Sequence, residues 1–100
     1  MKRYSISQEA IKDLDEISDY LANFSIEAGE RFIQKFTDKC RKLVTFPNMG
    51  KNYQEIMPNL KGMIVDDYIV FYLIKLEEVE IVRVVSGYRN LESVFVDPDN

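Results

Sequence analysis

The side chains best suited to chemistry in this sequence are basic and phenolic, and they lie in its second half. They are Lys61, Lys75, Arg83 and Arg89, with Tyr68, Tyr72 and Tyr88 as possible phenolic partners. Groups of these types can position a phosphate, activate a hydroxyl and stabilise the negative charge that develops in a transition state. Histidine, the most common general acid–base residue, is absent from the sequence.

Arg83 is the most informative of these residues. Strand alternation predicts that it shares one face with Ile81 and Val85. Among such apolar neighbours an unpaired guanidinium is costly, so it needs a partner. Two interpretations remain open: a contact to a target or to RNA phosphate, or an ion pair with a carboxylate of this chain or of a bound partner.

No metal site and no cofactor are expected. Four acidic residues in the first predicted helix are assigned to its solvated face, and they are Asp13, Asp15, Glu16 and Asp19. The single cysteine, Cys40, lies on an apolar helical stripe with Phe36 and Leu43. This position indicates a buried, inert thiol and not a reactive one.

The length and composition indicate one globular domain. The 100 residues are 46% hydrophobic and 30% charged, which excludes a disordered chain. Residues 1–95 are expected to form the domain. Residues 96–100 are expected to form a frayed acidic tail, because they are acidic and interrupted by Pro98. No apolar run is long enough to span a membrane and the N-terminus turns polar at once, so we expect a cytoplasmic protein with no membrane partner.

Charge is distributed unevenly along the chain. The net charge is −4, yet residues 31–63 hold seven basic and two acidic side chains. Proteins that bind nucleic acid broadly rely on positive charge to neutralise phosphates. Only the middle segment offers that charge, so generic nucleic-acid binding is not expected.

Two amphipathic helices joined by a short connection are predicted near the N-terminus. Ser7 and Ser25 are placed to cap them. The first apolar stripe comprises Ala10, Leu14, Ile17 and Leu21 with Phe24 behind, and the second comprises Ala28, Phe32, Phe36, Cys40 and Leu43. Pro47 ends the second helix. The basic residues of this helix (Arg31, Lys35, Lys39, Arg41 and Lys42) are interpreted as solvent-facing in preference to a nucleic-acid stripe.

Strand periodicity predicts a β-sheet beyond Pro47. The expected strands are residues 2–6, 53–56, 62–65, 68–76 and 80–86. Short connections between the later strands predict an antiparallel meander. Both faces of 68–76 and 80–85 are largely apolar, so the face away from the helices must be covered by something else or form a partner site.

The order of these elements and their motifs resembles the ParE/RelE toxin superfamily, and the ParE branch in particular. The matching stretches are Tyr4-Ser5-Ile6-Ser7 with Ala10, Asp13-Leu14 with Ile17 and Tyr20, Phe46-Pro47-x-x-Gly50, Tyr68 to Tyr72, and Ile81 to Arg89. The match covers residues 4 to about 95. The resemblance implies an α+β fold with an N-terminal strand, a helical hairpin and an antiparallel three- to four-stranded sheet.

The same resemblance implies a partner and a target. A ParD-like antitoxin from a neighbouring gene would fold onto the toxin, and its candidate contacts are Tyr68, Val70, Tyr72, Ile81 and Val85. ParE-like members resemble inhibitors of DNA gyrase, whereas RelE-like members resemble ribosome-dependent ribonucleases. Candidate target contacts are Lys61, Arg83, Arg89 and Tyr88.

Departures from the family pattern weaken the ribonuclease interpretation. Asn90 stands where an acid is usual, and Ser86 stands where a histidine is common. Lys61 replaces an arginine and lacks its bidentate geometry. A non-enzymatic gyrase inhibitor is therefore the leading hypothesis. An mRNA interferase and an inactive member that retains only antitoxin binding remain alternatives.

Overall fold

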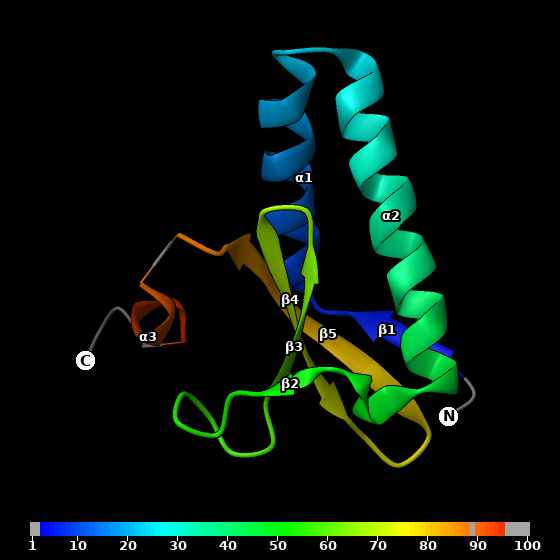
Figure 1. The fold of residues 1–100 in the computed structure, drawn as a ribbon, viewed down its shortest axis with the longest axis vertical. Coiled ribbons are helices and arrows are strands. Elements are labelled where there is room, and N and C mark those ends of the chain that lie inside the picture. Colours follow the sequence, from blue (N-terminus) through cyan, green and yellow to red (C-terminus); the bar gives the residue numbers. More distant parts are fainter. Residues whose placement is uncertain (1–2, 89, 96–100) are drawn as a thin grey trace.

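The computed structural model describes residues 3–88 and 90–95. Its elements are β1 (Arg3–Ile6), α1 (Gln8–Ala22), α2 (Ile26–Thr45), the 3-10 turn η1 (Pro47–Met49), β2 (Lys51–Asn52), β3 (Lys61–Val65), β4 (Tyr68–Ile74), β5 (Glu78–Ser86) and α3 (Leu91–Val94). The two long helices form a hairpin that extends well beyond the sheet (Figure 1). This order of elements confirms the predicted α+β fold class.

Both predicted helix caps are present. The Ser7 hydroxyl accepts a hydrogen bond from the Ala10 amide over 3.1 Å, and the Ser25 hydroxyl accepts one from the Ala28 amide over 3.0 Å. Phe24 departs from the predicted apolar stripe and is 72% exposed. Helix α1 ends one residue before its cap Asn23, so helical spacing no longer places Phe24 on the buried side.

The sheet has five strands in the order β1-β5-β4-β3-β2. Strands β3, β4 and β5 form the predicted antiparallel meander. Strand β1 is parallel to β5, which makes the sheet mixed. The chain between these two strands passes through the helical hairpin and then through β2, β3 and β4, so it is long enough for a parallel pairing.

The predicted strand over residues 53–56 is wrong. This stretch belongs to a closed loop, in which the Tyr53 amide donates to the Leu60 carbonyl over 2.9 Å. The amides of Ile56 and Met57 donate back to the Tyr53 carbonyl. These turns use the backbone groups that a strand would need, and Asn59 adopts the left-handed conformation at φ 66°.

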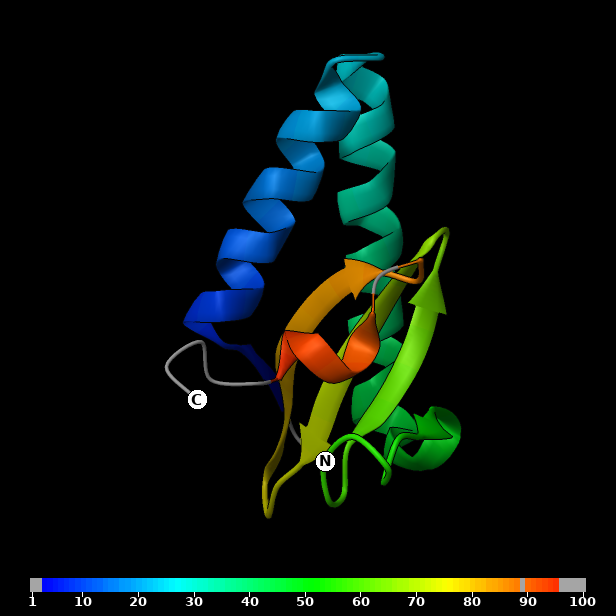
Figure 2. The same cartoon turned by 90° about the vertical axis from the view of Figure 1, so that its left-hand side faces the viewer.

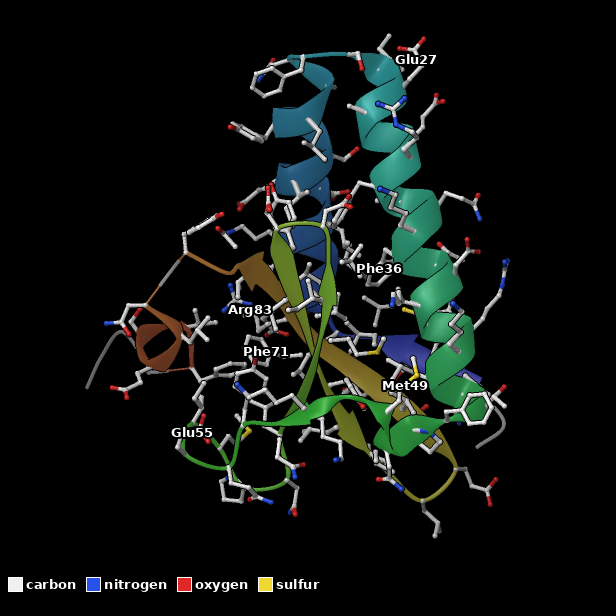
Figure 3. All side chains as sticks on the ribbon, in the orientation of Figure 1. Glu27, Phe36, Met49, Glu55, Phe71 and Arg83 are labelled. Carbon is white, nitrogen blue, oxygen red and sulfur yellow. The ribbon has the colours of Figure 1, made fainter. Side chains whose placement is uncertain are left out.

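Buried apolar residues form two clusters, one on each face of the sheet. The helix-side core lies beneath the hairpin, where Phe36 projects from α2 toward the strands (Figure 3). Its buried members are Ala10, Leu14, Ile17, Phe32, Phe36, Cys40, Leu43, Met63, Val65, Val70, Tyr72, Val79, Ile81 and Val84. The far-side core comprises Tyr53, Leu60, Ile69, Phe71, Val85 and Val94.

The far-side core is covered by the chain itself. Its cover consists of the 53–60 loop and α3, the short helix drawn in orange-red beside the strands (Figure 2). Helix α3 was not predicted from the sequence. Its Asn90 side chain caps it by accepting a hydrogen bond from the Glu92 amide. Most of the second apolar face therefore does not need a partner to cover it.

Cys40 has the buried environment that the sequence predicted. It is fully buried, and burial raises the pKa of its thiol from 9.0 to about 12. The unfolded chain thus ionises the thiol more readily than the folded chain does. Stability that is fully present below about pH 9 is therefore lost progressively as the pH rises toward 12.

Denaturant unfolding of the wild type and of Cys40→Ala at several alkaline pH values tests this expectation. The variant is expected to show a shallower decline above pH 9. Burial also raises the pKa of Tyr68 and of Tyr72, so a decline above pH 10 remains in both proteins. Equal slopes for the two proteins between these pH values would contradict the expectation.

No helix in the described part of the chain combines the length and apolar character needed to cross a membrane.

Candidate functional site

Arg83 is held by two elements of its own chain. Its Nε donates to Oδ2 of Asp13 over 2.7 Å, and its Nη2 donates to Oδ1 over 3.0 Å. Its Nη1 donates to the Val94 carbonyl of α3 over 3.1 Å. The Arg83 side chain is 22% exposed and that of Asp13 is 10% exposed. Of the two interpretations left open, the structure shows the internal ion pair.

A β-bulge determines which way Arg83 faces. Arg83 pairs with Phe71 but the next pair is Tyr72 with Ile81, so Val82 is an extra residue in β5. Ile81 belongs to the helix-side core and Val85 to the far-side core. The predicted shared face is therefore wrong for Ile81, because the bulge reverses the alternation between residues 81 and 83.

Asp13 also completes the edge of the sheet. Strand β1 pairs with β5 only as far as Ile81, so the following residues of β5 have no strand on that side within the described chain. Oδ2 of Asp13 accepts from the Val84 amide over 2.9 Å. Nearby, the Ser7 amide donates to the Ile81 carbonyl, and the Ser7 hydroxyl donates to the Val82 carbonyl. The start of α1 thus substitutes for a missing strand.

The assignment of Asp13 to a solvated helix face is wrong, since Asp13 as a whole residue is only 8% exposed. The sequence held a signal for this position. Asp13 lies three residues after Ala10 and four before Ile17, which places it on the apolar stripe itself. A carboxylate on such a stripe indicates a buried partner.

Charge around Arg83 disfavours a phosphate site. Hydrogen bonding to Asp13 raises the pKa of Arg83, with further electrostatic contributions from Asp13, Glu9 and Glu16. The hollow beside it, of about 410 Å³, is also lined by Glu9 and Glu80. A guanidinium already neutralised and flanked by acids attracts an anion weakly.

The other candidate target contacts do not gather around Arg83. Lys61 lies in β3, two strands away, and its Nζ donates to Oδ1 of Asn52 over 2.8 Å. Tyr88 is 88% exposed, beyond the end of β5. Arg89 lies outside the described residues. The described candidates therefore occupy separate places and form no single cluster.

Most of the candidate antitoxin contacts are internal. Val70, Tyr72 and Ile81 belong to the helix-side core and are at most 1% exposed. Tyr68 is partly buried against the same core, and Val85 is buried on the opposite face. In this structure the five residues do not share one accessible surface, since alternation and the bulge divide them between two covered faces.

Tyr72 has a structural role within the fold. Its hydroxyl donates to the Pro47 carbonyl over 2.7 Å and accepts from the Gly50 amide over 3.0 Å. A Cβ on Gly50 would lie 2.5 Å from that hydroxyl, so the close approach requires glycine. These bonds attach the turn after α2 to the middle of the sheet.

Several large apolar side chains remain exposed, and some of them gather at two places. Tyr20, Phe24 and Ile26 surround the far end of the hairpin, and Ile64 with Tyr88 lies near the β3–β4 turn. The described residues contain no group of three or more acidic or cysteine side chains arranged to hold a metal.

Comparisons with known proteins agree on one family. A family model described as the ParE toxin of the type II toxin–antitoxin system, parDE, matches residues 4–91. Toxin ParE3 of Caulobacter vibrioides is 26% identical over 80 residues, which cover 79% of this chain and 80% of that protein. A solved structure described as the chromosomal ParDE TA system from P. aeruginosa matches with a TM-score of 0.72 at 20% identity. That match covers 86% of this chain and 96% of the other.

Proposed function

The chain belongs to the ParE toxin family of type II toxin–antitoxin systems, and from that premise we propose that it acts by binding DNA gyrase and not by cutting RNA. The observation that supports this choice is that the Arg83 side chain is already bonded within its own fold. Its guanidinium is engaged by Asp13 and by the Val94 carbonyl. A ribonuclease site needs cations directed at the phosphate and its developing charge. The strongest such candidate is already occupied within the fold.

We further propose that a ParD-like antitoxin encoded beside this chain neutralises it. The related structure from P. aeruginosa is described as a ParDE system, which supports a partner of this type. Exposed apolar side chains at the hairpin end offer surface for such a partner. An antitoxin segment that orders on binding can cover a patch of this kind.

Induced expression with and without the neighbouring ParD-like reading frame tests the proposal in cells. Growth arrest is expected only without that frame. In vitro, the purified chain is expected to inhibit supercoiling by bacterial DNA gyrase and to increase the amount of cleaved DNA. Adding the antitoxin should restore supercoiling.

Two outcomes would reject the gyrase proposal. Normal supercoiling together with cleavage of ribosome-bound message would identify an mRNA interferase, and Lys61→Ala would then show whether the lysine contributes. Lys61 is preferable to Arg83 for that purpose, because substituting Arg83 leaves Asp13 unpaired inside the fold. No growth arrest without the antitoxin would identify an inactive family member.

A further inference from the structure

The outer edge of β3 is only partly used. Strand β2 pairs with Lys61 and Gly62 alone, and no described strand lies beside Met63, Ile64 and Val65 on that side. A two-residue turn joins β3 to β4, so the closing pair of Val65 and Tyr68 is hydrogen-bonded. Bonded pairs alternate along an antiparallel ladder. The backbone N–H and C=O of Ile64 are therefore directed outward, away from β4.

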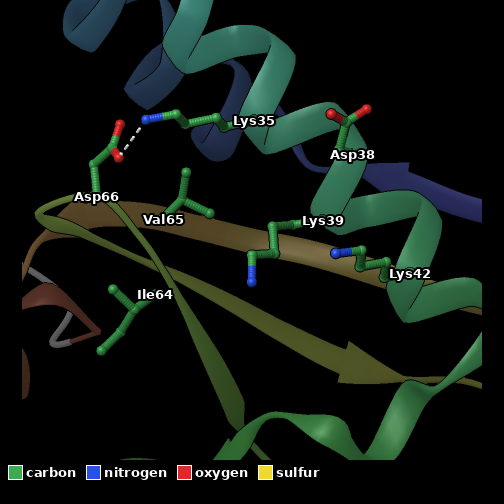
Figure 4. Close-up of a pocket in the computed structure, with 7 residues that line it drawn as sticks. All are labelled: Lys35, Asp38, Lys39, Lys42, Ile64, Val65 and Asp66. Carbon is green, nitrogen blue, oxygen red and sulfur yellow. Dashed lines mark hydrogen bonds and ion pairs between the residues drawn. The ribbon is translucent and has the colours of Figure 1, made fainter.

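A hollow of about 320 Å³ lies between this edge and helix α2 (Figure 4). Lys35, Lys39 and Lys42 line it from the helix, together with Asp38. Lys35 is paired with Asp66 over 2.9 Å. No ion pair involves Lys39 or Lys42 within the described residues, and Figure 4 shows both extending toward the hollow. The net charge that faces the edge is positive.

The two sides of the edge differ in character. Met63 and Val65 face the helix-side core, whereas Ile64 projects to the opposite side of the strand and is 66% exposed (Figure 4). A strand added here would direct alternate side chains to these two sides. Those on the helix side would meet lysines, and those on the other side would meet Ile64.

We propose that this edge binds an extended segment of another protein, added as a strand, in which acidic and apolar residues alternate. The residue that pairs with the outward backbone groups of Ile64 has an apolar side chain, which packs on the Ile64 side chain. Its two neighbours are Asp or Glu and approach Lys39 and Lys42. Acids at alternate strand positions recur about every 6.7 Å. Lys39 and Lys42 are separated by about 4.5 Å of helix rise, and their long side chains can spread to meet two acids at the strand spacing.

Lysines beside an exposed strand edge can also serve only to prevent aggregation. That role requires no partner and no sequence preference. Prevention of aggregation does not explain why Ile64 faces outward, because an exposed apolar side chain on a strand edge favours aggregation. An apolar contact at Ile64 beside the cations of Lys39 and Lys42 instead favours a strand in which apolar and acidic residues alternate.

Binding of the peptide Glu-Val-Glu-Val-Glu-Val-Glu to the isotope-labelled full chain, followed by amide chemical shifts, tests the proposal. The largest changes are expected in residues 62–66, with slower hydrogen exchange at Ile64. A second peptide, N-methylated at its valines, keeps every charge but cannot donate to the Ile64 carbonyl. This peptide is expected to bind at least about tenfold more weakly, because it loses the main-chain hydrogen bonds to β3.

A matched pair of double variants separates local from overall charge. Lys39→Glu with Lys42→Glu is expected to weaken binding by about tenfold or more, whereas Lys12→Glu with Arg31→Glu changes net charge equally at exposed sites away from the hollow. Equal binding by the two peptides or by the two double variants would overturn the proposal. So would shifts confined to other residues, no binding, or tighter binding of heptauridylate RNA at Lys39 and Lys42.

Discussion

Replacing Asp13 with alanine is expected to lower the free energy of unfolding by about 3–5 kcal/mol, the range found when one partner of a buried ion pair is removed. The substitution removes the two carboxylate acceptors of the Arg83 guanidinium, which keeps only the Val94 carbonyl, and it removes the acceptor of the Val84 amide. Arg83 is 22% exposed, so water can only partly replace these bonds. A domain of this size has a total stability of about 5–15 kcal/mol. The loss is therefore a large fraction of that total.

Urea unfolding monitored by circular dichroism measures this effect. Asp15→Ala is the matched control, because it removes an exposed carboxylate from the same helix. Its effect is expected within about 0.5 kcal/mol of zero. The double variant Asp13→Leu with Arg83→Met should regain part of the loss, since it removes both charges together. Equal stability of the Asp13 and Asp15 variants would contradict a stabilising role for the contacts of Asp13 with Arg83 and Val84.

The ion pair between Asp13 and Arg83 also changes how toxicity experiments should be interpreted. An Arg83 substitution that abolishes growth arrest would ordinarily be attributed to a lost target contact. Here the same substitution leaves the Asp13 carboxylate buried without its cation. Loss of folded protein is a sufficient explanation for that phenotype. Stability must therefore be measured before such a result is attributed to gyrase or RNA.

The features predictable from the sequence were those set by local chemistry. Ser7 and Ser25 cap their helices because a serine hydroxyl accepts from amides of the first turn wherever the helix begins. The helical stripes and the meander follow from apolar periodicity. Each of these signals is contained within a short window of sequence, and the fold class follows from their order.

The missed features depend on contacts between distant segments. Residue alternation alone does not reveal the extra Val82, and this bulge places Ile81 and Arg83 on different faces. Helix α3 has four residues, too few for a periodic pattern, and its position is fixed by packing on the far-side core. The burial of most candidate antitoxin contacts depends on distant segments too, because the helical hairpin, the 53–60 loop and α3 cover the two faces of the sheet.

Phe71→Ala is expected to lower the free energy of unfolding by about 3–5 kcal/mol, as for other large aromatic deletions in well-packed cores. Phe71 is fully buried at the centre of the far-side core. Its ring makes edge-on contacts with Tyr53 of the loop and with Phe95 after α3, at centroid distances of 5.1 and 5.3 Å. The substitution therefore weakens the attachment of both covering segments as well as leaving a cavity.

Denaturant unfolding combined with amide hydrogen exchange distinguishes these consequences. Phe24→Ala is the control, because that ring is 72% exposed and its loss leaves no buried cavity. In the Phe71 variant, the amides of residues 53–60 and 91–95 should lose protection before those of α1 and α2. If protection instead falls uniformly across the chain, the loop and α3 belong to the same cooperative unit as the hairpin, and no partner could displace them from the far side without unfolding the toxin.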